Sequence, residues 1–286
     1  MSKPWIFVSP ASRGIGHALT AHLLRTTTLP ILATARSDLA GVKESLVATA
    51  TSHGKPWSSE DQVPRLHVTH LDVTDESSVQ AAAEKAAALF PPSSHHLHLA
   101  FALPGILHPE KQPRRIDYGD ALETFRVNTL GPMLLMKWFG ELLPRKGTDL
   151  SEVKKMNSDS STGDEQDEFH IPAHATWLTT SARVGSISDN RLGGWYSYRA
   201  SKAGVNSLTK SFDLHLRTRS GDNAVAVAYH PGTVKTGLSK EFWGNVADDK
   251  LFSPEFAVRK MLEVVESRTV EDGGKCWDWK AEEVPP

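Results

Sequence analysis

Short apolar runs alternate with longer stretches of helical periodicity along most of this chain. Apolar residues recur every four positions at Ile15, Leu19 and Leu23, which predicts an amphipathic helix. Alternating strands and helices are typical of βαβ units around a parallel sheet, so we expect an α/β fold. Seven strands are predicted, at Trp5–Val8, Ile31–Thr34, Leu66–Asp72, Leu97–Ala102, Ala175–Thr180, Val225–Tyr229 and Lys275–Trp279.

Two polar segments interrupt this rhythm. Residues 146–172 are poor in apolar side chains, and we expect a mobile surface insertion there. A smaller excursion of the same kind covers residues 49–64. Because the alternation resumes after each, the sequence predicts a single domain over residues 1–286. In the long helix predicted over residues 122–139, Gly131-Pro132 predicts a kink.

The composition is that of an ordinary globular protein: 286 residues, a net charge of -2, 39% hydrophobic and 23% charged residues. The near-neutral charge gives no reason to expect nucleic acid or an anionic membrane as a partner. The first apolar segment is too short for a signal peptide, and no apolar run is long enough to span a membrane. Cys276 is the only cysteine, so no intrachain disulfide can form and we expect a cytoplasmic protein.

A tyrosine and a lysine four residues apart, Tyr198 and Lys202, begin the buried face of a predicted helix. On a helix the phenol and the ammonium of such a pair are neighbours. A phenol with a pKa of about 10 needs about 4 kcal/mol of preferential phenolate stabilisation to titrate near neutral pH. One ammonium at about 4 Å supplies roughly that much at an effective dielectric near 20. The spacing fits proton transfer, although it also occurs on solvated helix faces.

A glycine-containing segment, residues 9–16, follows the first predicted strand and opens the first predicted helix. An α/β fold places a nucleotide pyrophosphate at this position, where glycines let the phosphate approach backbone N–H groups. The alternative is a tight turn that binds no ligand. The position of the segment favours the ligand, and its predicted contacts are Ser9, Ser12, Arg13, Gly14 and Ile15.

Arg36 follows the second predicted strand, where an acidic residue would hold a free ribose 2′-hydroxyl. An arginine cannot accept that hydrogen bond but can pair with a 2′-phosphate, and Arg13 can reach the same group. The two arginines therefore favour NADP(H) over NAD(H), unless each is a solvated surface charge. After the third strand, Asp72 and Val73 offer a carboxylate for the adenine amino group and an aliphatic contact for its ring. The alternative role for Asp72, capping the next helix, is as plausible as binding the adenine.

Five motifs occur in a fixed order along the chain. They are the segment of residues 9–16, Leu71-Asp72-Val73, Asn128, Ser181 with Tyr198 and Lys202 beyond it, and residues 230–236 in His-Pro-Gly-Thr-Val-Lys-Thr. In this order the chain resembles the short-chain dehydrogenase/reductase family over nearly its whole length. The run Gly185–Arg199 resembles the C-factor and sniffer-type carbonyl reductase branch in particular.

The resemblance implies a three-layer Rossmann fold with a doubly wound, seven-stranded parallel sheet and helices on both faces. It also implies hydride transfer between NADP(H) and a small-molecule carbonyl or alcohol substrate. Tyr198 would donate the proton, and Ser181 would hydrogen-bond the same oxygen. Lys202 would lower the pKa of the tyrosine and bind the nicotinamide ribose, and Asn128 would hold a water that relays protons to the lysine. The contacts to the carboxamide end would come from Pro231, Gly232, Val234 and Thr236.

Two positions depart from the family pattern. Pro10 replaces the first glycine of the phosphate segment and cannot donate a hydrogen bond, although the donors at Arg13, Gly14 and Ile15 remain. The family's Asn-Asn-Ala-Gly reads Ala-Leu-Pro-Gly at residues 102–105, so an asparagine that stabilises the sheet is missing. Gly105 can still lie close to the adenosine ribose.

The catalytic serine has two candidates. The family's usual spacing to the tyrosine favours Ser186 by counting, because Ser181 is further from Tyr198. We nevertheless expect Ser181, because it directly follows a predicted strand and ligands sit at the carboxyl ends of strands. Tyr196 is a weaker proton-donor candidate than Tyr198, since Ala200 stands one turn after it.

Thirteen histidines raise the question of a metal. His95, His96 and His98 lie beside the fourth predicted strand, where His95-His96 abut a loop. His67 and His70 fall on one predicted strand at a spacing that points them to opposite faces. The sequence therefore predicts no metal site.

The remaining expectations concern the ligand and the assembly. An apolar lid over the substrate is predicted from Leu238, Phe242, Trp243, Leu251 and Phe252, unless these residues only cover the core. Family members usually pair through the helices that here begin near Leu122 and Tyr198, so the resemblance implies a homodimer or homotetramer. The alternative function is an NADPH-binding sensor or signalling protein with little turnover, which Pro10 and Ala102 motivate.

Overall fold

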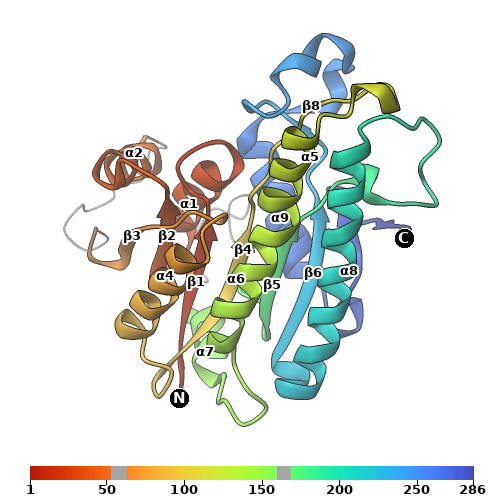
Figure 1. Cartoon of the computed structure of the whole chain (residues 1–286). Helices are drawn as coiled ribbons and strands as arrows, with labels where there is room; N and C mark the ends of the chain where they lie inside the picture. Colours follow the sequence, from red (N-terminus) through yellow and green to blue (C-terminus); the bar gives the residue numbers. More distant parts are fainter. Residues whose placement is uncertain (53–62, 160–168) are drawn as a thin grey trace.

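A central sheet of seven parallel strands and one antiparallel edge strand carries the fold (Figure 1). The computed structural model describes residues 1–52, 63–159 and 169–286. The strand order is β10-β9-β6-β5-β4-β1-β2-β3, so the chain starts in the middle and winds outward in both directions from a switch point between β1 and β4. The strands are β1 (Lys3–Ser9), β2 (Ile31–Ala35), β3 (Leu66–His70), β4 (His95–Ala102), β5 (Ala175–Thr180), β6 (Ala224–His230), β9 (Cys276–Asp278) and β10 (Glu283–Val284).

The predicted doubly wound sheet of seven parallel strands is confirmed, and each predicted strand overlaps an observed one. In this sheet the strand that was not predicted is β10, which pairs antiparallel with β9 at the edge. It is two residues long, which is too short to show a period in the sequence.

Helices cover both faces of the sheet (Figure 1). On one face, side chains such as Ile6 and Leu178 pack with α1 (Gly14–Thr26), α2 (Leu39–Thr51) and α9 (Pro254–Ser267). On the other face, Phe7 and Trp177 pack with α4 (Glu76–Leu89), α6 (Gly131–Phe139) and α8 (Tyr196–Arg219). Successive strand residues point to opposite faces, and because both faces are covered nearly all residues of β1, β2 and β6 are buried.

The helix predicted over residues 122–139 is interrupted. α5 (Tyr118–Phe125) and α6 are joined by a π-helical turn at Arg126–Leu130, in which the Gly131 N–H bonds to the Arg126 carbonyl. The predicted kink at Gly131-Pro132 is therefore misplaced by about one turn. Pro132 lies in the first turn of α6 and has no N–H to give to the turn before it, which favours a widened turn there. Such turns occur often at functional sites, and this one carries Asn128.

The segment predicted as a mobile surface insertion is partly built into the fold. Residues 151–159 form α7 (Ser151–Asp159), and Val153 is fully buried against the sheet. Phe169 and Ile171 join the same apolar cluster. Three apolar side chains thus pack parts of this polar stretch against the rest of the fold, and its mobility stays a prediction. Residues 160–168, and residues 53–62 of the smaller excursion, lie outside the described residues.

A small cap lies beyond β6. Strands β7 (Thr233–Val234) and β8 (Leu251–Phe252) pair in parallel, and the residues between them form two 3-10 turns, Lys240–Asn245 and Asp248–Lys250. Since β7 follows directly on β6, this cap sits at the carboxyl end of the sheet. It brings apolar side chains of residues 238–252 over that end.

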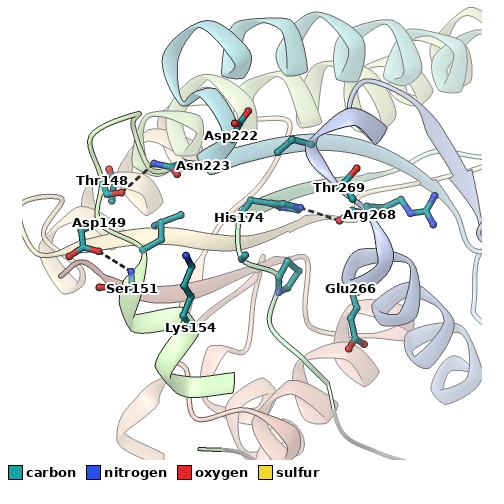
Figure 2. Close-up of a pocket in the computed structure, with 14 residues that line it drawn as sticks. Thr148, Asp149, Ser151, Lys154, His174, Asp222, Asn223, Glu266, Arg268 and Thr269 are labelled. Carbon is teal, nitrogen blue, oxygen red and sulfur yellow. Dashed lines mark hydrogen bonds between the residues drawn. The ribbon is translucent and has the colours of Figure 1, made fainter. Parts of the chain in front are cut away.

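A cavity of about 590 Å³ lies at the opposite, amino edge of the sheet (Figure 2). Its lining residues, among them Lys154, His174 and Asn223, precede β5, β6 and β9 or belong to α7. In open α/β sheets ligands bind at the carboxyl ends of the strands, so this cavity is not the expected site. Within the described parts of the chain, no helix is both long and apolar enough to cross a membrane.

Candidate active site

A pocket of about 500 Å³ lies at the carboxyl ends of β1, β4, β5 and β6. Each strand contributes the loop that follows it, so the switch point between β1 and β4 opens into this pocket. Its wall comprises Pro10, residues 13–16, Leu103–Gly105, Leu107, residues 180–184, Trp195, Tyr198, Lys202, residues 230–234, Thr236, Leu238, Ser239, Phe242 and Val246.

Tyr198 and Lys202 project into the pocket from the first turns of α8, as the spacing predicts. Both side chains are buried, with exposed fractions of 8% and 1%. The Lys202 Nζ donates a hydrogen bond to the Thr180 carbonyl oxygen at 2.8 Å and lies 5.8 Å from the centre of the Tyr198 ring. The phenol and the ammonium therefore share one cavity, with β5 holding the ammonium.

Burial shifts both groups away from their charged forms. It raises the pKa of Tyr198 to about 12 and lowers the pKa of Lys202 to about 8. The lowering of the tyrosine pKa by the lysine, which the resemblance implies, is not seen here, because burial is the cause of the shift and it raises the pKa. At neutral pH the phenol is protonated and can donate a proton, while the ammonium is largely charged.

The two candidate serines are both engaged in other hydrogen bonds. The Ser181 hydroxyl donates to the Asn206 side-chain oxygen at 2.6 Å and lies 3.3 Å from the Lys202 carbonyl oxygen. The Ser186 hydroxyl accepts from the Asp189 N–H at 3.0 Å. Ser181 lines the pocket, as does its neighbour Ala182. For Ser181 to hydrogen-bond a substrate oxygen, its hydroxyl hydrogen has to leave Asn206.

Asn128 hydrogen-bonds both main-chain groups of Ile106, in the loop after β4. Its Oδ1 accepts from the Ile106 N–H at 2.8 Å, and its Nδ2 donates to the Ile106 carbonyl at 2.9 Å and to the Ser201 hydroxyl at 3.1 Å. The side chain is fully buried. It thus ties the π-helical turn to the pocket loop and to α8, next to Lys202. Gly105 lies in the same loop, where an added Cβ would be 3.8 Å from the Lys202 Nζ.

The phosphate segment forms a close turn into α1. Gly14 has a φ of +58°, and an added Cβ on Gly16 would lie 1.9 Å from the Pro10 carbonyl oxygen, so neither position tolerates a side chain. Arg13 and Ser12 are exposed. Ser9 is fully buried and its hydroxyl accepts from Thr34 at 2.9 Å, which turns it into the sheet.

The predicted contacts for the adenosine end lie beyond the pocket lining, after β2 and β3. Arg36 is exposed, and its charge contributes to the lowered pKa of Asp72. Burial alone would raise the pKa of this carboxyl, but hydrogen bonds from the Thr74 backbone and hydroxyl outweigh it. Val73 packs against the backbone of Gly131. Asp72 thus caps the turn at Thr74, while Asp75 caps α4 itself.

The loop after β6 closes the pocket opposite the phosphate segment. Gly232 has a φ of +73°, and an added Cβ would lie 2.6 Å from the Phe252 ring. The Thr236 side chain packs next to Gly14, with its Cγ2 3.3 Å from where a Cβ on that glycine would be. Val234 and Pro231 also line the wall. The motif at residues 230–236 and the phosphate segment therefore meet, although they are far apart in sequence.

Only part of the segment predicted as an apolar lid lines the pocket. Leu238 and Phe242 line the pocket, whereas Trp243 donates its indole N–H to the Ser239 hydroxyl at 2.9 Å and Phe252 packs against Phe256 and Trp279. Additional apolar wall comes from Leu107, Trp195 and Val246, which the sequence did not single out.

Two further polar groups at the site were missed in the sequence. The Thr180 hydroxyl and the His230 Nδ1 are buried without a hydrogen-bond partner among the described residues, and both residues line the pocket. Burial lowers the pKa of His230 to about 4, so its imidazole is neutral. Each is the last residue of its strand, Thr180 of β5 and His230 of β6, and that position was the available signal.

Two of the histidines considered as metal ligands hydrogen-bond to each other instead. The His98 Nε2 donates to the Pro172 carbonyl at 2.8 Å, so its Nδ1 accepts from the His96 Nε2 at 3.0 Å. The His96 Nδ1 then accepts from the Ser2 hydroxyl at 2.9 Å. Among the described residues another set, His108, Asp120 and Glu123, brings possible ligand atoms within 4.8 Å of one another; both carboxylates are exposed.

Comparison with known proteins gives relatives that cover most of the chain. C-signal of Myxococcus xanthus is 31% identical over 170 residues, 59% of this chain and 81% of that protein. The 1-hydroxy-2-glutathionyl-2-methyl-3-butene dehydrogenase of Rhodococcus sp. (strain AD45) is 28% identical over 205 residues, 72% of this chain and 74% of that one. No family model matches the chain.

Solved structures match over the full length. The NADPH-bound carbonyl reductase from chicken fatty liver has a TM-score of 0.74 and 26% identity, with both chains covered completely. The carbonyl reductase Sniffer of D. melanogaster, at 20% identity and a TM-score of 0.73, also covers all of both chains and shares the fold.

Proposed function

Because the chain belongs to the short-chain dehydrogenase/reductase family, we propose that it is an NADPH-dependent reductase of small-molecule aldehydes or ketones. The observation that carries the proposal is the placement of Tyr198 and Lys202 together in the pocket at the switch point of the sheet. A phenol that stays protonated at neutral pH, buried beside an ammonium, is suited to donate a proton to a developing alkoxide.

The residues present fit a dinucleotide. The turn into α1 leaves backbone N–H groups at a helix N-terminus, and Gly14 and Gly105 keep the wall free of side chains. Arg13 and Arg36 would pair with the 2′-phosphate, Asp72 and Val73 would contact the adenine, and Ser12, Gly14 and Ile15 would border the pyrophosphate. Ser9 would contribute through its backbone alone, because its hydroxyl is bonded within the sheet. Pro231, Gly232, Val234 and Thr236 would contact the carboxamide end.

NADPH, when bound, supplies the hydride that the carbonyl carbon receives. The Tyr198 hydroxyl would donate its proton to the carbonyl oxygen as negative charge develops there. Lys202 would stabilise the phenolate that results, at a distance set by its bond to Thr180. Asn128 would hold the loop that faces Lys202, and Ser181 would give a second hydrogen bond to the oxygen after turning from Asn206.

The pocket wall supports an apolar substrate. Trp195, Phe242 and Leu238 form one side of it, with the Trp195 and Phe242 rings 5.1 Å apart. We infer that the carbonyl group is carried on an apolar or aromatic body that fits against this wall.

Self-association and compartment also belong to the proposal. Tyr118, Leu122 and Phe125 on α5 and Leu214 on α8 expose large apolar side chains, which supports pairing of copies through these helices as a homodimer or homotetramer. The single, buried Cys276 fits a reducing compartment such as the cytoplasm. Light scattering of the purified protein tests whether it forms a homodimer or homotetramer.

A second candidate function is NADPH-dependent signalling with little turnover. It is favoured by the name of one relative, C-signal, and by Pro10 in the phosphate segment. Both functions require cofactor binding, and they differ in whether the bound cofactor is consumed.

The test is a panel of aldehydes and ketones assayed by the loss of NADPH absorbance, with Tyr198→Phe as the comparison. We expect turnover that falls by on the order of 10²- to 10⁴-fold in the variant, with NADPH affinity retained. NADPH binding without consumption for every substrate would favour the signalling function instead. Equal rates for the two proteins would remove Tyr198 from the mechanism.

A further inference from the structure

Glu110 is a buried carboxylate beside the pocket to which the proposed reaction assigns no role. It lies in the loop between β4 and α5 and is 4% exposed. Burying an ionisable group costs free energy unless hydrogen bonds compensate, so the partners of this carboxylate indicate what it does.

The carboxylate and the main-chain carbonyl of Glu110 both accept hydrogen bonds from the start of α8. Its carboxylate oxygens accept from the Ser197 N–H at 3.4 and 3.3 Å, and the Ser197 hydroxyl donates to Oε1. The main-chain carbonyl of Glu110 accepts from the Trp195 N–H at 2.6 Å. One residue thus holds the helix entry at two points, Trp195 and Ser197, the second of them 87 positions away in sequence.

The start of α8 has no cap of its own. The N-cap position is Trp195, whose φ is +51° and whose side chain makes no capping hydrogen bond, and the first turn contains no acidic residue. The first N–H groups of a helix have no partner within the helix, and its N-terminus favours negative charge. The Glu110 carboxylate supplies both a hydrogen-bond acceptor and a negative charge from another part of the chain.

The turn that Glu110 caps is the one that carries the proposed proton donor. Tyr198 follows Ser197 directly, and the Trp195 indole contacts the Tyr198 ring edge-on at 6.1 Å. At its other end, the same loop is held at Ile106 by Asn128. The loop is therefore fixed at two points, one beside Lys202 and one beside Tyr198.

We propose that Glu110 is a positioning residue, which holds the first turn of α8 so that the Tyr198 hydroxyl and the Trp195 indole keep their places in the pocket. The inference rests on the proposed reductase function. Glu110 acts through Ser197 and Trp195, and a misplacement of about 1 Å at a reacting group can cost on the order of 10²-fold in rate.

The test compares Glu110→Ala and Glu110→Gln with Asp213→Ala. Asp213 is also a buried carboxylate, 2% exposed. It lies on α8, far from Tyr198, and accepts a hydrogen bond from the Ala226 N–H of β6 at 3.1 Å. We expect Glu110→Ala to lower kcat by roughly 10- to 100-fold with little change in the KM for NADPH. Glu110→Gln, whose amide oxygen still accepts from Ser197, should keep most of the rate. Asp213→Ala should lose thermal stability and keep its kcat per folded molecule.

A readout without turnover separates this inference from the proposed function. Hydrogen exchange of the backbone amides of residues 197–199 should be faster in Glu110→Ala than in the wild-type protein and in Asp213→Ala. Faster exchange supports the positioning contact even if no substrate is reduced, and unchanged exchange overturns it. A kcat equal to wild type in Glu110→Ala also overturns it. Ser197→Ala, which removes only the hydroxyl donor, should shift both readouts in the same direction by less, and it replaces Glu110→Ala if that variant does not fold.

Discussion

The Nζ of Lys202 donates a hydrogen bond to the Thr180 carbonyl oxygen at 2.8 Å, which fixes the ammonium at the carboxyl end of β5. The lysine belongs to α8, and the turn after β5 packs so closely on it that a Cβ on Gly185 would lie 2.9 Å from the Lys202 Cβ. Strand and helix are therefore held together at the Lys202 ammonium, which is buried beside Tyr198. The position of this charge, rather than its mere presence, decides what the phenol can do.

The pH dependence of reduction should follow Lys202. Burial lowers its pKa to about 8 and raises that of Tyr198 to about 12, so below pH 8 the lysine is charged and the phenol protonated. We expect kcat/KM for reduction to be level between about pH 6 and pH 8 and to fall above pH 8 as the ammonium is lost. Stopped-flow rates across this range check the profile. A kcat/KM that keeps rising from pH 8 to pH 10 would contradict it.

The cofactor preference should depend on Arg36. This side chain is exposed after β2, and its charge acts on Asp72. We expect Arg36→Gln to raise the KM for NADPH about tenfold, the equivalent of one lost charge-assisted contact, and to leave the KM for NADH unchanged. Arg114→Gln, at another exposed arginine, is the matched control. An equal effect on both cofactors would remove Arg36 from the 2′-phosphate site.

Substitution should show which of the two serines hydrogen-bonds the substrate oxygen. Ser181 lines the pocket but its hydroxyl hydrogen is bonded to Asn206, whereas the Ser186 hydroxyl accepts from Asp189. We expect Ser181→Ala to lower kcat by on the order of 10- to 100-fold, because a hydrogen bond to the developing oxyanion is lost, and Ser186→Ala to leave kcat within about twofold.

A large loss of kcat in Ser186→Ala with kcat retained in Ser181→Ala would show instead that Ser186 gives the hydrogen bond to the substrate oxygen. If neither variant changes kcat, Ala182→Ser becomes informative, because Ala182 lines the same wall without a hydroxyl. A gain in rate there would show that the second hydrogen bond is missing from the natural site.

Acid should destabilise the protein through a buried pair of histidines. Burial lowers the pKa of His96 to about 4 and of His98 to about 3, against about 6.5 in the unfolded chain. The unfolded chain therefore binds more protons below pH 6.5, so the stability is complete above pH 6.5 and is lost as the pH falls toward 4. Each histidine contributes up to about 1.4 kcal/mol per pH unit.

Urea unfolding at pH 7, 6 and 5 measures this slope. His98→Gln should make it shallower, and His215→Gln, at an exposed histidine of α8, should not. A slope that is the same in all three proteins would mean that the pair takes up its protons without unfolding.

The fold could be predicted because its strands are buried on both faces. Runs such as Trp5–Val8 are continuously apolar, and no local alternative accounts for seven predicted strands in alternation with helices. The proton-donor pair was equally accessible, because a spacing of four residues on a helix fixes the neighbours Tyr198 and Lys202 without reference to the rest of the chain.

The parts of the site that could not be predicted depend on contacts between distant residues or on side-chain rotamers. Nothing in the sequence links Glu110 to Ser197, and nothing tells that the Ser181 hydroxyl turns toward Asn206. The π-helical turn at Arg126–Leu130 lies in the turn before Pro132, so the proline signal predicted the interruption but placed it about one turn too far along the chain.

The central claim is hydride transfer to a carbonyl carbon at the pocket beside Tyr198, and label transfer tests it most directly. NADPH carrying deuterium at the nicotinamide C4 is incubated with the protein and a panel of apolar aldehydes and ketones, and the alcohols are examined by mass spectrometry. We predict one deuterium on the carbinol carbon with the wild-type protein and a strongly reduced amount with Tyr198→Phe. Saturable binding of NADPH with no deuterium in any alcohol would contradict the account.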